Sequence, residues 1–405
     1  MSAAQNSPGR PPRPALSQSD VTGLKYFKLL GNILHSLRSH KDCPNRQLHY
    51  DQLAALILLR FFNPVLGSLR ALVQASDLDN VRRKLGVKHV SLGSLSESAR
   101  VFDPKLLHDL FCQLAAGIAD QPAPPGLPPE LALVAVDGTL IKALPRMAWA
   151  LWLDGEHHAL KVHLEFNVLK GIPQAVEITD GNGNEKDILE AQLQPNKLYA
   201  LDAGYGRYSL LEAIRACGSS FVVRLGEGLV FETVEERPLT SADQAAGLIS
   251  DQVAWIGSAK GARRAFSAPL RLLRLRLPEP VLPARVSRPT PGKNYRHRVE
   301  ELWLVSDRLD LPAETIALLY KHRWQIEVFF RWLKHLLGLK HLVFESPEGV
   351  SIQIYCALIA SLLISLWTGR KPTKRTLEMI QLYFQGWASE EELEAHIERL
   401  ALISK

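Results

Sequence analysis

Four chemically active side chains recur at regular spacing within one helical segment of the sequence: Tyr320, Arg323, Glu327 and Lys334. At about 100° per residue, the last three lie within roughly 60° of Tyr320 around the helix, so the four form one stripe. The opposite arc is apolar and predicts packing onto a core; it consists of Ile326, Phe329, Leu333 and Leu336. The stripe is compatible with a surface ladder of ion pairs or with a functional site, and the segment alone leaves both open.

Two aspartates elsewhere in the sequence favour the site. Asp137 interrupts the apolar strand pattern LALVAVDGTLI, where a carboxylate is costly unless it is paired or bound to a metal. Asp202 ends a second apolar segment, KLYALDAGYG. If the two strands are neighbours and the helix crosses them, Glu327 joins both aspartates. Three carboxylates suit Mg²⁺ or Mn²⁺ better than zinc. Two such ions roughly 3.5–4 Å apart can flank a phosphodiester.

The elements expected to position these acids follow from the hydrophobic periodicity of the middle of the chain. Strands are predicted at 131–141, 160–169, 174–179, 197–206 and 220–225, with helices at 184–193 and 207–218. The order β-β-β-α-β-α-β predicts an α/β fold with a mixed five-stranded sheet. The strands that carry Asp137 and Asp202 can then lie side by side.

Composition shifts divide the chain into regions. Residues 1–20 predict a disordered tail, 21–120 a helical domain, and 121–129 a stiff proline-rich linker. The catalytic region comprises 130–225 and 307–345, interrupted by a β-rich insertion at 226–306, and 346–405 is predicted to be helical. The helical domain contains a basic cluster: Arg82, Arg83, Lys84, Lys88 and His89. This cluster fits either a helix-turn-helix or an ordinary helical subdomain with a solvated charge run.

The charge distribution permits a polyanionic partner. The 405 residues carry a formal net charge of +6. Between Lys260 and Arg298 there are eleven Lys or Arg and one acid, Glu279. That run fits a phosphate-contacting surface or a solvated strand face equally well.

Other sequence features limit the class of protein. The four cysteines have no metal-binding spacing, which favours a reducing cytosol. The N-terminal segment lacks the apolar region of a signal peptide. The longest apolar run, 354–367, is shorter than the roughly 20 residues that span a bilayer, so it predicts a buried helix and no membrane partner.

The spacing Tyr-x2-Arg-x3-Glu-x6-Lys resembles the signature of insertion sequence 4 family DDE transposases. The segment HRWQIEVFFRWLKHLLGLKHL is similar to the third-acid block of that family, VDGT to the first and LDAGYGR to the second. The segment DAGY departs from many members, which carry Arg or Lys after the aspartate. The resemblance implies a ribonuclease H-like catalytic domain, a DNA-binding domain at 21–120 and the β-rich insertion before Glu327.

The resemblance also implies roles for individual residues. Asp137, Asp202 and Glu327 would be catalytic and would bind two Mg²⁺ (or Mn²⁺) ions. Tyr320, Arg323 and Lys334 would contact the DNA backbone. Trp303 and Trp324 are candidates for stacking on a flipped base, with core packing as the alternative for each.

The expected activity is metal-dependent cleavage at the ends of an insertion element, followed by transfer of the 3′-hydroxyl into target DNA. The expected partners are double-stranded DNA, both the terminal inverted repeats and the target, and a second copy of the chain. The expected location is the bacterial cytoplasm, at the nucleoid when bound to DNA. A stand-alone ribonuclease H-like nuclease or resolvase, and an inactive transposase-derived DNA-binding protein, are the alternatives.

Overall fold

The structure is a computed structural model that describes residues 34–38, 40, 45–119, 125–128, 130–152, 157–226, 228–257, 265–281 and 299–402. The expected tail at 1–20, most of the linker at 121–129 and most of the basic run between Lys260 and Arg298 lie outside these ranges.

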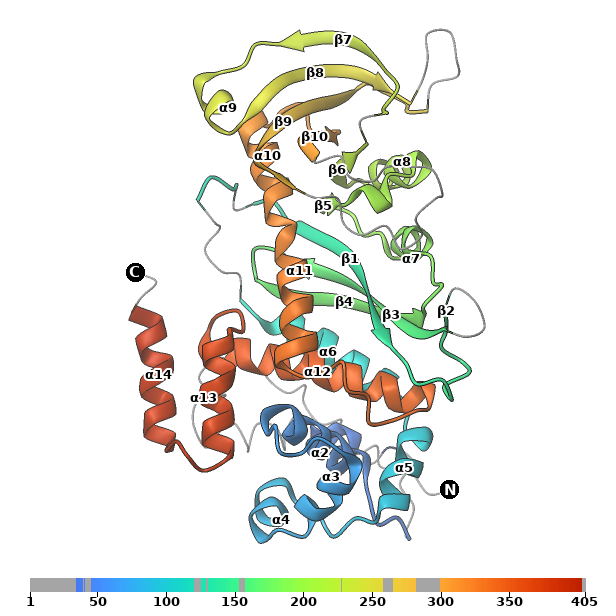
Figure 1. The fold of residues 1–405 in the computed structure, drawn as a ribbon, viewed down its shortest axis with the longest axis vertical. Helices are drawn as coiled ribbons and strands as arrows, with labels where there is room; N and C mark the ends of the chain where they lie inside the picture. Colours follow the sequence, from blue (N-terminus) through green and yellow to red (C-terminus); the bar gives the residue numbers. More distant parts are fainter. Residues whose placement is uncertain are drawn as a thin grey trace, which may run out of the picture.

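Within the described residues, ten strands form a mixed sheet at the centre of the fold (Figure 1). The strand order is β2-β3-β1-β5-β6-β10-β9-β8-β7, with β4 paired to β3. The strands are β1 (Leu133–Lys142), β2 (Leu151–Trp152), β3 (His157–Asn167), β4 (Ile172–Asp180), β5 (Leu198–Leu201), β6 (Ser220–Leu225), β7 (Phe231–Arg237), β8 (Leu248–Ile256), β9 (Leu270–Val281) and β10 (Val299–Ser306).

The five expected strands occur in the expected sequence order, and the predicted adjacency is confirmed. Strand β1 pairs with β5 in parallel, through Leu133–Leu198 to Ala135–Ala200. Strands β5 and β6 are also parallel, whereas β1, β3 and β4 are antiparallel neighbours. The sheet extends beyond five strands because β10 pairs with β6 and continues into β9, β8 and β7. The strands of the expected insertion therefore belong to the same sheet.

Helices cover the sheet and form a second body beside it (Figure 1). They are α2 (Tyr50–Phe62), α3 (Leu69–Ser76), α4 (Asp79–Leu85), α5 (Leu92–Val101), α6 (Lys105–Gly117), α7 (Glu185–Gln192), α8 (Tyr208–Ala216), α9 (Ser241–Ala245), α10 (Ala313–His322), α11 (Trp324–Arg331), α12 (Pro347–Thr368), α13 (Lys374–Phe384) and α14 (Glu390–Leu402). Short 3₁₀ turns occur at His35–Leu37 and Ala203–Tyr205, and a π-helical turn at Trp332–Leu336.

Many helices begin at a Ser or Thr whose side-chain oxygen accepts a hydrogen bond from the backbone N–H three residues later. This N-cap satisfies a donor that the helix leaves unpaired. The residues that do so are Ser68, Ser91, Thr240, Ser346 and Thr373.

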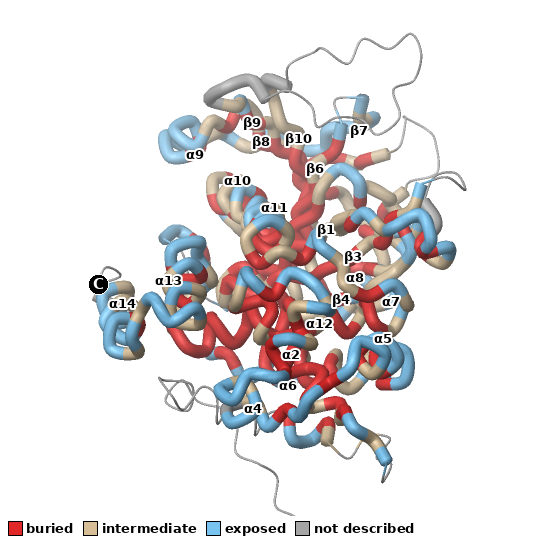
Figure 2. The backbone as a smooth tube through the Cα atoms, turned by 60° about the horizontal axis from the view of Figure 1, so that its bottom comes forward, coloured by how far each residue is buried: buried red, intermediate tan, exposed pale blue. Residues whose placement is uncertain are grey.

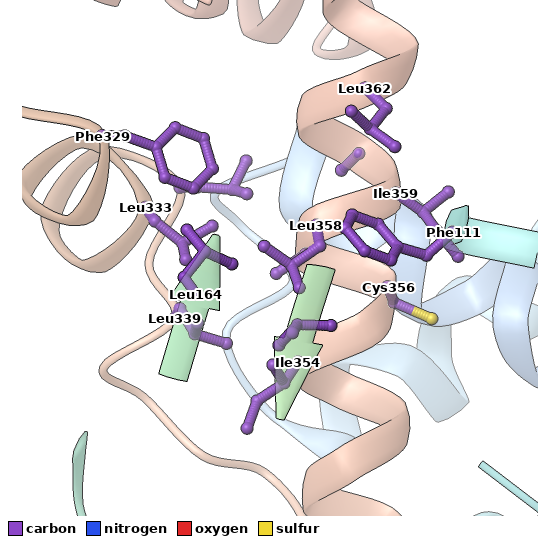
Figure 3. Close-up of a cluster of buried hydrophobic side chains, with 14 of the residues drawn as sticks. Phe111, Leu164, Phe329, Leu333, Leu339, Ile354, Cys356, Leu358, Ile359 and Leu362 are labelled. Carbon is purple, nitrogen blue, oxygen red and sulfur yellow. The ribbon is translucent and has the colours of Figure 1, made fainter. Parts of the chain in front are cut away.

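Helix α12 joins the sheet to the N-terminal helices. It packs against α2, α5 and α6 on one side and against β4 on the other. Figure 3 shows Phe329 and Leu333 from the α11 region, Leu164 from β3 and Phe111 from α6 around Leu358 of α12. By length and composition this 22-residue helix could cross a membrane, but 89% of its most apolar 18-residue window is buried inside the protein. The expected buried helix is therefore confirmed, and it is longer than the apolar run suggested.

The basic cluster of the N-terminal region lies on and after α4. Helix α4 has seven residues and ends at Gly86, whose φ of 64° suits a glycine. Arg82 and His89 each approach the carboxylate of Asp77, at 3.7 and 2.5 Å. Part of this charge is therefore engaged within the chain.

Candidate active site

The two aspartates lie on neighbouring strands. Asp137 is opposite Leu164 in the β1–β3 pairing, and its Oδ1 accepts a hydrogen bond from the Gly138 N–H at 2.8 Å. Asp202 follows the last residue of β5 and caps the 3₁₀ turn, accepting from the Ala203 N–H at 2.6 Å. Because β1 and β5 are parallel neighbours, both carboxylates reach the same part of the sheet.

The helical segment that carries the stripe is less regular than expected. Helix α10 begins after Pro312 and ends at His322, and α11 starts again at Trp324. Arg323 stands at the junction with helical φ and ψ of −51° and −35°. Beyond α11 a π-helical turn follows, in which the Leu337 N–H donates to the Trp332 carbonyl. Such turns are frequent at functional sites. Helix α11 packs against β1 and so brings Glu327 toward Asp137.

Arg323 is the central cation of the site. Its side chain is 8% exposed, and its Nη2 donates to Glu327 Oε1 at 2.6 Å. Its guanidinium lies 5.6 Å from the centre of the Tyr320 ring. Within the described part of the chain, its buried Nε and Nη1 have no hydrogen-bond partner. A buried cation with unused donors is prepared to bind an anionic oxygen.

The charges of Asp137, Asp202 and Glu327 affect the pKa values of residues around them. Burial raises the pKa of Asp137 to about 7; the Gly138 N–H and Arg323 oppose this rise, and the negative charges of Glu185 and Glu327 add to it. The pKa of Arg323 is raised despite its burial, because Tyr320, Asp202 and Glu327 favour its charged form. Arg323 is therefore a charged neighbour that Asp137, Asp202 and Glu327 have in common.

Tyr320 and Lys334 complete the stripe. Tyr320 is buried; this burial raises its pKa, Arg323 opposes the rise and Asp202 adds to it. Lys334 Nζ donates to the Leu140 carbonyl of β1 at 2.6 Å. Burial lowers the pKa of Lys334, and the charge of Asp137 opposes the change. Arg323, Glu327 and Lys334 thus lie near Asp137 of β1, whereas the charged neighbours of Tyr320 include Asp202.

Two further residues at the site were not predicted. Glu185, in the first turn of α7, lies against Gly138 and pairs with Lys161 at 3.1 Å. Tyr205 is buried, which raises its pKa well above the ordinary value, and the charges of Glu185, Asp137 and Asp202 add to the rise. In the sequence, Glu185 has the form of an acid that stabilises a helix start, so no signal distinguished it.

No group of three Asp, Glu, His or Cys side chains in the described ranges is close enough to hold a metal ion as it stands. In this arrangement Glu327 is bonded to Arg323. The chemistry of the donor set nevertheless fits a hard divalent cation, because such a cation takes carboxylate oxygens as ligands and the buried Asp137 lacks enough positive charge to keep its ordinary pKa.

The two candidate aromatic residues lie in different surroundings. Trp303 on β10 is half-buried, with the guanidinium of Arg274 4.8 Å from its ring centre and the ring of Phe231 at 5.9 Å. Trp324 is 52% exposed. Core packing is therefore the better description of Trp303 but not of Trp324.

The described part of the basic run corrects the phosphate interpretation for one residue. Arg271 is buried and forms an ion pair with Asp251, with Nη2 and Oδ2 2.6 Å apart. Arg274 pairs with Glu301 at 2.7 Å, whereas Arg276 is exposed. Arg271 is buried in the sheet, where a guanidinium needs a carboxylate partner. It therefore does not contact the phosphates of a bound polyanion.

Residues 128–363 match the family model described as "Transposase DDE domain", which covers more than half of the chain. The chain belongs to this transposase family. The three acids and the stripe all fall inside the matched region, and the resemblance to the insertion sequence 4 family is confirmed.

Several curated relatives of this transposase chain carry transposase names. It is 26% identical to y4zB of Sinorhizobium fredii over 57% of its own length and 59% of that protein. It is 23% identical to the transposase named for element IS5377 of Geobacillus stearothermophilus, over 60% of its own length and 59% of that protein. The protein named for element IS4SA of Synechocystis is 23% identical, over 64% of this chain and 68% of that one. The match thus spans 59% of the length of each of the first two relatives.

A solved structure, a piggyBac transposase synaptic complex with hairpin DNA, aligns with 92% of the transposase chain and 81% of its own. The TM-score is 0.38 and the identity 11%. At that score the alignment does not establish a shared fold.

Proposed function

We propose that this chain is a DNA transposase that cleaves the ends of an insertion element and joins the 3′-hydroxyl to target DNA. The observation that carries the proposal is the group of three acids around Arg323, inside a region that matches a DDE transposase family. The order β4-β3-β1-β5-β6, with β1, β5 and β6 parallel, supports a ribonuclease H-like core.

Asp137, Asp202 and Glu327 would hold two Mg²⁺ or Mn²⁺ ions, which would supply charge stabilisation and an activated nucleophile for phosphodiester chemistry. Glu327 can serve as a ligand once its carboxylate is released from Arg323. The unused Nε and Nη1 donors of Arg323 would then bind phosphate oxygens of the DNA.

Tyr320 and Lys334 would position the same strand. Lys334 reaches across to β1 through the Leu140 carbonyl, so its ammonium group is held near Asp137. Burial around Tyr320 and Tyr205 limits water near the acids, which strengthens each charge–charge interaction there. Trp324, which is exposed, remains a candidate for stacking on a DNA base, and Trp303 a weaker one.

The proposal extends to partners and location. Double-stranded DNA, as terminal inverted repeats and target, would be the substrate. A homodimer would hold two ends together, since one site cannot hold both. The bacterial cytoplasm, at the nucleoid, is the compartment where such DNA is found.

The test is cleavage of a labelled duplex that carries the repeats flanking the coding sequence, with Mg²⁺ and with chelator. We expect cuts at the repeat ends in Mg²⁺ and none in chelator. Asp137→Asn should abolish cutting, whereas Asp180→Asn, at the exposed end of β4, should not. Cutting without regard to the repeats would favour a general nuclease. Repeat binding without any cutting would favour an inactive DNA-binding protein.

A further inference from the structure

Glu185, at the start of α7, approaches the backbone of Gly138 next to Asp137. A Cβ atom on residue 138 would lie 2.5 Å from Glu185 Oε1, so the carboxylate fills the space that any larger residue would occupy. The N–H of the same glycine donates to Asp137 Oδ1 at 2.8 Å. The two carboxylates therefore meet at one residue of β1, and the missing side chain of Gly138 is what allows Glu185 to come so close.

The two carboxylates approach Gly138 from different faces of the sheet. Ala135 of β1 belongs to the core around α12, whereas Val136 belongs to the core that contains Leu189 of α7. Because side chains alternate along a strand, Asp137 continues the first face and Gly138 the second. The pairing of β1 with β5 ends at Ala135. Groups from both faces can therefore meet beyond that point, where β5 no longer separates them.

The charge of Glu185 affects the same neighbours as the three acids do. Burial raises the pKa of Asp137, and the charge of Glu185 adds more to this rise than the charge of Glu327 does. Burial also raises the pKa of Tyr205 well above its ordinary value, and Glu185, Asp137 and Asp202 add to that rise in decreasing order. Glu185 is therefore electrostatically part of the acid group, although it lies on a different element.

The surroundings of the acids are suited to a ligand and carry positive charge of their own. The Arg323 side chain is 8% exposed, and its Nε and Nη1 have no hydrogen-bond partner within the described ranges. Lys334 is a second cation near Asp137. Beside these two cations, three carboxylates would neutralise only part of the charge of two divalent ions. A fourth carboxylate would bring the site closer to balance.

Lys161 holds Glu185 in its present position. The Lys161 Nζ lies 3.1 Å from Glu185 Oε1 and donates to the Gly183 carbonyl at 3.2 Å. A divalent cation can replace an ammonium group as the partner of a carboxylate, because it carries twice the charge. Ions from solvent can reach this pair, since α7 lies at the surface of the molecule with most of its residues exposed or intermediate (Figure 2). Lys161 thus stands to Glu185 as Arg323 stands to Glu327.

A cavity on another side of α11 offers no carboxylate. It has a volume of about 810 Å³, and its lining includes Trp324, Val328 and Arg331. The first two lie roughly 100–140° around the helix from Arg323. No Asp or Glu is among the described residues that line the cavity. Substitutions there are therefore not expected to change the binding of a divalent cation.

We propose that Glu185 is a fourth carboxylate of the cation site, a ligand that α7 supplies and that Lys161 holds until a divalent cation replaces the lysine. This role rests on the proposed function, in which Asp137, Asp202 and Glu327 hold the cations. If Glu185 served only to pair with Lys161 and stabilise the fold, its loss would not change the affinity for a cation.

The first test is Mn²⁺ binding by the full chain, followed by electron paramagnetic resonance of the free ion. Glu185→Gln should weaken Mn²⁺ binding by at least about tenfold. Glu190→Gln is the matched control, because it removes an acid of the same type from the same helix that also pairs with a cation, Arg207. The control should bind like the wild type. Equal binding by Glu185→Gln and the wild type would overturn the proposal.

Gly138→Ala tests the position of Glu185 while every carboxylate is retained. The new methyl group should displace the end of the flexible Glu185 side chain and weaken Mn²⁺ binding by a similar factor. Combining Gly138→Ala with Glu185→Gln should add little, because both changes remove the same contact. Gly204→Ala, close to Asp202, places its methyl group where no atom lies within 4 Å and should bind like the wild type. Undiminished binding by Gly138→Ala would contradict the proposal.

Lys161→Gln distinguishes a ligand from a structural ion pair. Removal of the competing ammonium group should strengthen Mn²⁺ binding several-fold. Weaker or unchanged binding would show that the Lys161–Glu185 pair only maintains the local fold, and would sink the proposal.

The triple variant Asp137→Asn, Asp202→Asn, Glu327→Gln separates this proposal from the proposed function. If the triple variant loses Mn²⁺ binding while Glu185→Gln retains it, only the role of Glu185 is wrong. If the triple variant binds like the wild type, or if the wild type binds no Mn²⁺, the cation site of the proposed function is wrong as well.

Discussion

The two sides of the helical region from Ala313 to Leu336 reverse the usual distribution of polar and apolar side chains. On one side Tyr320 and Arg323 are buried, although they are polar or charged. On another side Trp324 and Val328 are about half exposed, although they are apolar. A helix that only stabilised a fold would place these groups the other way round.

Burying Arg323 and exposing Trp324 each costs free energy, so the stability of the fold does not explain why they are placed this way. A buried guanidinium loses hydration and is stabilised here by Glu327 and the nearby acids. Exposed aromatic surface is unfavourable unless something covers it. Under the proposed function, one side of the helix would serve chemistry on an anion and the other would serve binding. The third arc, with Ile326 and Leu333, supplies the ordinary core packing.

The largest expected effect is on cleavage activity. It distinguishes the side of the helix that carries Glu327 from the side that lines the cavity. Glu327→Gln should reduce strand cleavage by at least about a thousandfold, or about 4 kcal/mol, because it removes a metal-binding charge while preserving size. Arg331→Gln, four residues later on the cavity rim, should change cleavage by less than a few-fold. The measurement is the cleavage rate on end DNA in Mg²⁺, with DNA affinity measured alongside. Comparable losses in both variants would remove the distinction between the two sides.

The second prediction concerns the free energy of unfolding. It distinguishes the side of the helix that packs in the core from the side that lines the cavity. Leu333→Ala deletes a fully buried side chain and should lower the free energy of unfolding by about 3 kcal/mol. Val328→Ala should lower it by less than about 0.5 kcal/mol, because that side chain is half exposed. Denaturant unfolding of both variants provides the test. A large loss in Val328→Ala would show that the cavity is part of the core.

The third prediction concerns Arg323 itself. Arg323→Met removes the cation that faces three acids and should destabilise the protein by about 2–3 kcal/mol. This is less than for a fully buried pair, because Glu327 is partly exposed. Added Mg²⁺ should recover much of the loss if the acids bind it, since the ion replaces the missing charge. Thermal unfolding with and without Mg²⁺ measures both effects, and Arg331→Met is the control. Recovery of equal size in the control would argue against a metal-binding role for the acids.

The smallest effect tests a buried polar group on the strand next to β1. His163 pairs with Gly138 across the strands, and its Nε2 contacts Thr179 Oγ1 at 2.9 Å. Burial, with the charge of Lys161, lowers the pKa of His163 to about 4. The unfolded chain therefore binds the proton more readily, and stability falls as pH drops from about 6.5 toward about 4. His163 should contribute a loss of roughly 2 kcal/mol between pH 7 and pH 5, measured as the difference between the wild type and His163→Gln, because the raised pKa of Asp137 contributes in the opposite direction over the same range. An unchanged pH profile in that variant would refute it.

Local patterns in the sequence predicted much of the fold. The strands that carry Asp137 and Asp202 are apolar segments with clear ends, and the β-α-β connection through α8 accounts for the parallel pairing of β5 and β6. The spacing of the Tyr320–Lys334 stripe depends only on helical geometry, so those four side chains could be grouped in advance. The breaks in the helix at Arg323 and at the π-helical turn could not be predicted, because tertiary packing overrides the local helical pattern there.

The pairing of strands and side chains that are far apart in the sequence could not be predicted. Nothing local indicates that β10 pairs with β6, so the sheet was expected to have five strands. The sequence likewise shows Arg271 only as one cation in a basic run, and its ion pair with Asp251 is evident only in the structure. Glu185 and Tyr205 reach the site only through folding of α7 and the 3₁₀ turn against β1.

The measurement that tests the account most directly is Mn²⁺ binding by the full chain, followed by electron paramagnetic resonance of the free ion. The account predicts that the wild type and the Asp180→Asn control bind Mn²⁺ equally. The triple variant Asp137→Asn, Asp202→Asn, Glu327→Gln should lose that binding while it remains folded. Undiminished Mn²⁺ binding by the triple variant would contradict the claim that these three acids form one cation site.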